Sequence, residues 1–185
     1  MNTISKPTRM KKLLIIFALI TTTILSSQNS VIAQSGDGKI GELVYELNLK
    51  MSSMTEFGFS LQDAASGKVS IPLGGARFDA NFNGTIIGKD FKGTVDKLVD
   101  YFYLRPDGRF ELNIHGEITT DGGQKISISG GGIATPRKGS TISDLRENII
   151  LFSSHKEFIY LNTLQIWAVG TVDNATGIIN IKGYK

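Results

Sequence analysis

The sequence predicts an all-β protein, an antiparallel β-barrel of roughly eight to ten short strands with at most one or two short helices. Apolar and polar residues alternate along many short segments, clusters of Gly, Asp and Asn separate these segments, and 21 of the 185 residues are glycine. Such alternation is typical of strands with one face in a core, and glycines permit the bulges of a strongly curved sheet. We favour a closed barrel over a sandwich because closure removes exposed strand edges.

Residues 104–132 carry the clearest sign of this fold, a meander of three strands joined by two tight turns. The turns are predicted at Pro106-Asp107-Gly108 and at Asp121-Gly122-Gly123, because these residue types favour tight turns. The residues of one strand face are apolar or glycine: Phe110, Leu112, Ile114, Gly116 and Ile118. The glycines at 130–132 indicate a bent strand end or a close approach of two backbones.

Alternation also predicts strands on both sides of this meander. Before it, the predicted strands are 42–50, 57–61, 69–73, 76–82 and 85–87. After it, they are 149–152, 164–169 and 178–184, with a turn at 173–177 joining the last two.

Two segments are predicted to contain helical structure. The apolar spacing from Val95 to Phe102 fits a helix, whereas the alternation from Val99 to Tyr103 fits a strand, so we expect a helical turn followed by a strand from about residue 98. Residues 141–144, Thr-Ile-Ser-Asp, have the form of a capping box and predict one short helix.

Residues 1–33 are predicted to be a secretory signal peptide. Lys6, Arg9, Lys11 and Lys12 precede an apolar run at 13–25, and the segment ends in Val-Ile-Ala. The apolar run is shorter than the roughly 20 residues of a membrane-spanning helix. We therefore expect cleavage near Ala33, a flexible arm at 34–41 and a single barrel domain at 42–185. The mature chain would be exported, periplasmic or extracellular, with no integral membrane span.

Net charge argues against nucleic-acid binding. The whole chain has 20 basic and 17 acidic residues, but four basic and no acidic residues lie in 1–33. The remaining 152 residues therefore carry 16 basic and 17 acidic side chains, a net charge of −1. A nucleic-acid-binding domain needs clustered Lys and Arg on its folded surface, and no such cluster occurs.

The chain contains no cysteine, which excludes disulfides and a thiol nucleophile. Only two histidines occur, His115 and His155, whereas a zinc site usually takes three or four ligands. No phosphate-binding loop or dinucleotide-binding motif occurs with the required spacing. We therefore expect neither a metal nor a cofactor.

The order of motifs along the mature chain resembles that of the domain of unknown function 3237 family, small barrel proteins. The matching segments are Leu73-Gly74-Gly75-Ala76-Arg77-Phe78 followed by Gly84, Arg105-Pro106-Asp107-Gly108, Thr119-Thr120-Asp121-Gly122-Gly123, Phe158-Ile159-Tyr160-Leu161-Asn162, and the closing strand at 179–184. The chain departs from the family at Tyr160, where a Trp is common, and at Ser127 and Ser129, near which relatives often have an Arg. The resemblance implies a closed or nearly closed antiparallel barrel with a central cavity, and it implies no established reaction.

The candidate ligand-binding residues are His115, Glu117, Tyr160, Asn162 and Trp167. His115 and Glu117 share a strand face with Glu111 and Asn113, and this polar row is favoured to lie outside the barrel; if it faced inward, it would form a polar pocket wall. Asn162 is favoured to hold a strand entrance through backbone hydrogen bonds, and Trp167 to lie in the core. No catalytic residue is assigned.

Three functions remain open from the sequence. The first is a barrel that binds a small apolar or aromatic ligand. The second is a cofactor-free enzyme in the same cavity, of isomerase or cyclase type. The third is a structural or interaction protein with a filled barrel. Whether the chain is an enzyme, which ligand it binds and its oligomeric state are not decided by the sequence.

Overall fold

The computed structural model of the protein describes residues 41–185, so the predicted signal peptide and nearly all of the predicted arm lie outside the described residues. The described chain forms one closed barrel in which each strand pairs antiparallel with its sequence neighbours and the last strand pairs with the first. The strands are β1 (Leu43–Glu56), β2 (Ala76–Gly88), β3 (Lys92–Leu104), β4 (Phe110–Thr120), β5 (Lys125–Pro136), β6 (Ile142–Phe152), β7 (Ile166–Asp173) and β8 (Ile178–Tyr184). The prediction of an all-β antiparallel barrel is confirmed.

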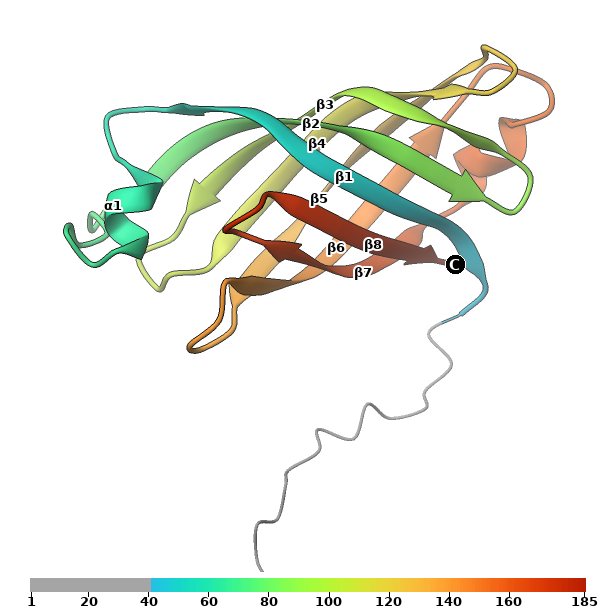
Figure 1. The fold of residues 1–185 in the computed structure, drawn as a ribbon. Helices are drawn as coiled ribbons and strands as arrows, with labels where there is room; N and C mark the ends of the chain where they lie inside the picture. Colours follow the sequence, from blue (N-terminus) through green and yellow to red (C-terminus); the bar gives the residue numbers. More distant parts are fainter. Residues whose placement is uncertain (1–40) are drawn as a thin grey trace, which may run out of the picture. The chain divides into compact units, whose positions relative to one another are not determined.

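The two ends of the barrel are built differently (Figure 1). At one end, the α1 end, residues 57–75 connect β1 to β2 and contain the short helix α1 (Leu61–Ala65). At the opposite end, the η1 end, residues 153–165 connect β6 to β7 and contain the 3-10 helix η1 (Ile159–Thr163). Both helices have five residues, in agreement with the prediction of at most one or two short helices.

The predicted strands at 57–61 and 69–73 are wrong. β1 pairs with β2 from Tyr45 and Gly88 to Glu56 and Phe78, and its other side pairs with β8. Closure therefore leaves no free strand edge for residues 57–75 among the described strands. Ser60 caps α1 by accepting a hydrogen bond from the Asp63 backbone N–H at 3.3 Å.

The predicted helical turn before residue 98 is also wrong, because Lys92–Leu104 is one strand. The register with β4 shifts between Val95 and Lys97, which marks a bulge. A bulge adds one residue to a strand, so the inward positions Val95 and Leu98 lie three residues apart instead of two. Apolar residues three positions apart also share one face of a helix, so the bulge accounts for the wrong prediction of a helical turn.

The predicted helix at 141–144 is replaced by the start of β6. Ile142 pairs with Asp173 of β7, and Ser143 pairs with both Pro136 of β5 and Val172 of β7. Asp144 accepts hydrogen bonds from the Arg137 guanidinium at 2.6 and 3.1 Å across the β5–β6 turn, so it does not cap a helix.

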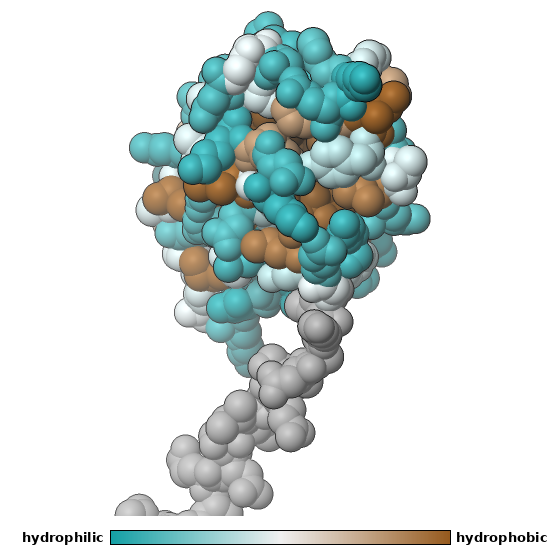
Figure 2. Space-filling view, turned by 90° about the vertical axis from the view of Figure 1, so that its right-hand side faces the viewer, coloured by the Kyte–Doolittle hydropathy of each residue, from teal (hydrophilic) through white to brown (hydrophobic). Residues whose placement is uncertain are grey.

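The hydrophobic core lies inside the barrel and extends to the η1 end. Phe91, Phe158 and Leu161 are buried there, and the rings of Phe91 and Phe158 meet edge to face at 6.1 Å. Figure 2 looks at this end and shows hydrophobic patches scattered among hydrophilic residues. No residue of α1, at the other end, is buried.

Candidate functional site

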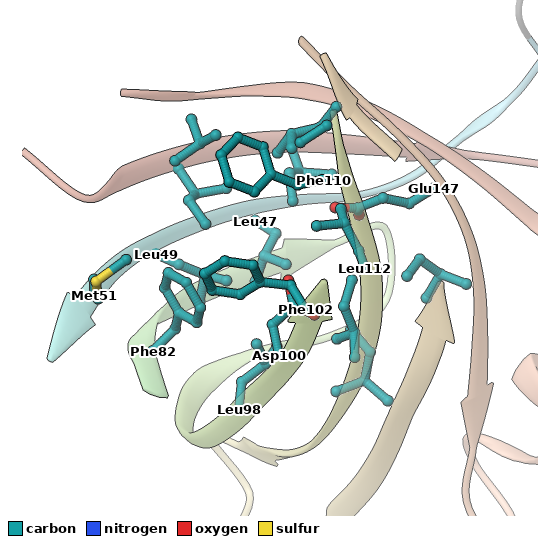
Figure 3. Close-up of a pocket in the computed structure, with 18 of the residues that line it drawn as sticks. Leu47, Leu49, Met51, Phe82, Leu98, Asp100, Phe102, Phe110, Leu112 and Glu147 are labelled. Atoms are coloured by element: carbon teal, nitrogen blue, oxygen red, sulfur yellow. The ribbon is translucent and has the colours of Figure 1, made fainter. Parts of the chain in front are cut away.

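The barrel encloses a cavity of about 150 Å³ with mostly apolar walls. All eight strands and α1 contribute residues to it: Tyr45, Leu47, Leu49, Met51, Met54, Leu61, Phe82, Leu98, Asp100, Phe102, Phe110, Leu112, Ile114, Ile128, Ala134, Leu145, Glu147, Ile149, Val172, Asn174, Ile179 and Ile181. Figure 3 shows the carboxyl groups of Asp100 and Glu147 inside this apolar enclosure. Apolar walls with a few converging polar groups are typical of small-molecule sites.

Asp100 occupies an inward position of β3 and is only 7% exposed. One carboxylate oxygen accepts a hydrogen bond from the backbone N–H of Asn113 at 2.8 Å. The ladder between β3 and β4 is interrupted between the Asp100–Ile114 and Tyr103–Glu111 pairs, next to this N–H. Burial raises the pKa of Asp100 to about 6, although this hydrogen bond opposes the rise.

Glu147 lies at an inward position of β6 between Leu145 and Ile149 and is 3% exposed. Burial, followed by the nearby charge of Asp100, raises the pKa of its carboxyl group to about 8. No hydrogen bond from the described residues holds this pKa down. At neutral pH Glu147 is therefore predominantly protonated and Asp100 predominantly ionised, an arrangement suited to an acid and a base in one site.

Tyr45 supplies a third buried polar group. Its ring packs against Gly183 of β8, where a Cβ would lie 2.6 Å from two ring carbons. Its hydroxyl is buried and has no hydrogen-bond partner among the described residues. Burial, followed by the charge of Glu147, raises the pKa of Tyr45 above its usual range, so the hydroxyl stays protonated.

The strand register places two of these groups, Glu147 and Tyr45, in one transverse row of the barrel. Glu147 pairs with Ala168 of β7, Ala168 pairs with Gly183, and Gly183 pairs with Tyr45. The two positions between Glu147 and Tyr45 along this transverse row are therefore a small residue and a glycine. On the other side, Gly132 of β5 pairs with Glu147 and carries no side chain into the barrel.

The glycines at 130–132 are a close approach of backbones, one of the two structures predicted from the sequence. A Cβ at Gly130 would lie 2.3 Å from the carbonyl oxygen of Asn148, and one at Gly132 would lie 2.2 Å from that of Arg146. Glycine therefore lets β5 and β6 approach closely, and it keeps the inward positions of β5 beside Glu147 free of side chains.

The polar row of β4 lies on the outside of the barrel, as favoured from the sequence. His115 is exposed, and its Nε2 is 3.1 Å from Oδ1 of Asn113. Glu117 forms ion pairs with Lys125 at 3.1 Å and Lys97 at 3.6 Å, and the hydrogen bond from Lys125 lowers its pKa most. Neither side chain lines the cavity.

Tyr160 and Asn162 belong to η1, at the end of the barrel opposite α1. Asn162 accepts a hydrogen bond from the Ser153 backbone N–H at 2.8 Å and donates one to the Ser153 carbonyl at 3.0 Å. It therefore holds the backbone at the exit from β6, whereas a strand entrance was predicted. The Tyr160 hydroxyl is 3.5 Å from the Asp90 carboxylate. Neither residue lines the cavity, and their role as ligand contacts stays a prediction.

Trp167 was favoured as a core residue, but 47% of it is exposed on the outer face of β7. Its neighbours along the strand, Ile166 and Ala168, are the buried ones. None of the five candidate residues, His115, Glu117, Tyr160, Asn162 and Trp167, contacts the cavity or joins the others in one site around it.

The sequence reasoning missed Asp100 and Glu147. A signal was present, because each is the acidic member of an otherwise apolar alternating row, with Leu98 and Phe102 flanking Asp100 and Leu145 and Ile149 flanking Glu147. The bulge near residue 96 disguised the first row. The second was missed because β6 was predicted only from residue 149 onward.

The described residues hold no group of three or more His, Asp or Glu placed to bind a metal ion. None of the helices in residues 41–185 has the length and apolar character needed to cross a membrane.

No protein-family model matches the chain, and no curated protein matches its sequence. Solved structures share the fold at low sequence identity. A protein of unknown function from Clostridium acetobutylicum has a TM-score of 0.60 at 19% identity, over 77% of this chain and 95% of that chain. A β-barrel-like protein from Acinetobacter baumannii has a TM-score of 0.60 at 16% identity, over 77% and 92%. An enzyme from Penicillium herquei has a TM-score of 0.52 at 17% identity, over 78% and 92%.

These likenesses show a barrel fold that recurs among proteins of unknown function. Membership of the domain of unknown function 3237 family stays a prediction from the motifs.

Proposed function

We propose that this protein binds a small, mostly apolar molecule inside its barrel. The observation that carries the proposal is the cavity of about 150 Å³, whose walls are apolar except for a few converging polar groups. A cavity of roughly this volume lined by aliphatic and aromatic side chains is large enough for benzene. The cavity favours binding over a structural protein with a filled barrel.

Binding is tested by native mass spectrometry of the purified protein and by titration with toluene followed by NMR. Ala134→Leu adds three carbon atoms to the cavity wall and is expected to weaken toluene binding by about 10-fold or more. Ala65→Leu makes the same substitution at an exposed position of α1 and is expected to change nothing. Absence of any bound or added apolar molecule from the cavity would refute the proposal.

A second candidate function is acid–base catalysis without a cofactor, as in an isomerase or cyclase. The specific observation is the pair Asp100 and Glu147, whose pKa values of about 6 and about 8 place a base and an acid in one cavity at neutral pH. The fold also occurs in an enzyme from Penicillium herquei. Turnover of a bound compound that disappears in Glu147→Gln, while binding is retained, would establish this function.

We further propose that the barrel acts outside the cytoplasm, after removal of residues 1–33. The support is the basic start, short apolar run and small terminal residues of the leader. N-terminal sequencing of the protein from its host tests this, and a mature chain that begins near Gln34 is expected. A cytoplasmic chain that retains Met1 or Met10 would contradict it.

A further inference from the structure

The cavity wall has an uneven inventory of charge. Two of the residues that line the cavity, Asp100 and Glu147, carry carboxyl groups. No residue that lines the cavity is Lys, Arg or His. Arg146, the neighbour of Glu147 in β6, donates to the carbonyl oxygen of Leu145 instead. Buried ionised carboxyl groups in proteins are ordinarily paired with a cation. Asp100, the ionised member of this pair at neutral pH, has no basic side chain beside it in the wall.

The hydrogen-bonding capacity of the same groups is also incompletely used. Asp100 accepts one hydrogen bond, from the backbone N–H of Asn113. Glu147 is 3% exposed and accepts none from the described residues, and the Tyr45 hydroxyl is buried without a partner. Three polar side chains around one apolar space thus have free positions for a ligand that donates hydrogen bonds.

The chemistry of these groups excludes one ligand class and favours another. A carboxylic acid such as a fatty acid would bring a third carboxyl group next to Asp100 and Glu147, with no basic side chain in the wall to neutralise it. An alcohol or ketone would occupy one or two of the free positions and leave the acidic pair without a counter-charge. An ammonium group donates several hydrogen bonds and supplies the missing positive charge.

The remaining wall fits the rest of such a molecule. Phe102 and Phe110 lie toward the α1 end from Asp100 and from its partner Ile114 along β3 and β4, and Phe82 lines the same cavity (Figure 3). Met51, Met54 and Leu61 lie near the same end. A ligand with one polar end and an apolar body would place the polar end at mid-barrel and the body between these side chains.

We propose that the barrel selects hydrophobic amines, small molecules that carry one protonated amino group seated between Asp100 and Glu147 with an apolar or aromatic body above it. This inference rests on the proposed ligand-binding function and names the ligand class for that site. The Tyr45 hydroxyl, on the same transverse row as Glu147, can accept a hydrogen bond from the amino group or donate one to Glu147.

Four probes with the same ring test the inference on the full mature chain: benzylamine, benzyl alcohol, toluene and benzoate. Dissociation constants are measured by calorimetry or NMR titration at about pH 8. Benzylamine is expected to bind about 10-fold or more tightly than benzyl alcohol, because it forms charge-assisted hydrogen bonds with two buried carboxyl groups. Benzoate is expected not to bind.

The variants Asp100→Asn and Glu147→Gln preserve shape and remove the charge. In the double variant the preference for benzylamine over benzyl alcohol is expected to fall to about 2-fold or less, while toluene binding is retained. Glu117→Gln is the matched control, because Glu117 lies on the outside of β4 and does not line the cavity. This variant is expected to keep the wild-type preference for benzylamine over benzyl alcohol. Retained toluene binding also shows that the variants are folded.

The outcomes separate the inference from the function on which it rests. If toluene and benzyl alcohol bind but benzylamine binds no better, the amine inference is overturned and the binding barrel stands. If benzoate binds as well as benzylamine, the electrostatic argument is overturned. If none of the four probes enters the cavity, both the inference and the proposed function fail.

Discussion

At the scale of single residues, the Glu147 carboxyl group links the stability of the barrel to pH. Its pKa in the folded state, about 8, lies above its usual value of 4.5, so the folded chain holds this proton where the unfolded chain has released it. The resulting stability is fully present below about pH 4.5 and is lost as the pH rises through about 8. Asp100 acts in the same direction at lower pH, through about 6.

Glu147→Gln should remove most of this dependence. Relative to the wild type, the variant is expected to gain roughly 2–5 kcal/mol of unfolding free energy between about pH 4.5 and pH 9. Urea unfolding at a series of pH values measures the difference. Glu157→Gln, in an exposed loop, serves as the control. A difference between wild type and Glu147→Gln that stays constant with pH would contradict the assignment of Glu147 as a buried, protonated acid.

The buried hydroxyl of Tyr45 leads to a second prediction at this scale. Because this hydroxyl has no partner among the described residues, Tyr45→Phe removes an uncompensated polar group. The ligand-free variant is expected to be as stable as the wild type or more stable, by up to about 2 kcal/mol. In contrast, Tyr103→Phe loses a hydrogen bond to the Gly74 carbonyl at 2.7 Å and should cost about 1 kcal/mol. Thermal unfolding measures the stability of both variants. A loss of stability in Tyr45→Phe as large as that in Tyr103→Phe would contradict the finding that the Tyr45 hydroxyl has no hydrogen-bond partner among the described residues.

At the scale of elements, the closeness of β5 and β6 depends on glycine. A Cβ at Gly132 would lie 2.2 Å from the Arg146 carbonyl oxygen and 2.8 Å from the Glu147 Cα, and both are backbone atoms that cannot move without shifting the strand. Gly132→Ala is therefore expected to cost more than about 2 kcal/mol of unfolding free energy. Gly74→Ala, where a Cβ meets nothing within 4 Å and φ is negative, should change stability by less than about 0.5 kcal/mol. Denaturant unfolding measures both, and equal costs would contradict the close approach.

Individual elements show how far sequence periodicity predicts this fold. The meander formed by the end of β3, β4 and β5 was predictable because its turns and its alternation agree. Periodicity failed at the bulge after Val95, where one extra residue changes the spacing. It also failed at 57–75, where alternating residues find no free strand edge. Both failures arise from pairing with distant strands, which local pattern does not encode.

The candidate site could be predicted only in part, for a reason that belongs to the whole molecule. Alternation correctly placed the face of β4 that carries His115 and Glu117 outside the barrel. Asp100 and Glu147 lie on different strands, and they face one another only because the sheet closes and the residues between them include Gly130 and Gly132. The pKa values of both carboxyl groups are raised because the closed barrel buries them.

Closure also makes the two ends of the barrel unequal, and ligand entry should follow this difference. The η1 end is filled by Phe91, Phe158 and Leu161, all buried, whereas α1 covers the other end without one buried residue. Leu61 of α1 lines the cavity from that end. We therefore expect a ligand to enter beside α1.

The two ends should respond oppositely to truncation of one apolar side chain. Phe158→Ala removes a buried ring that packs against Phe91 and is expected to cost about 3–5 kcal/mol of unfolding free energy. Leu61→Ala should cost less than about 1 kcal/mol, because no residue of α1 is buried, and should speed ligand exchange several-fold by opening the cover. NMR line shapes of bound toluene report the exchange rate, and hydrogen exchange should show weak protection at 57–75. If Leu61→Ala left exchange unchanged, entry beside α1 would be refuted, because this is the side chain through which α1 contacts the cavity.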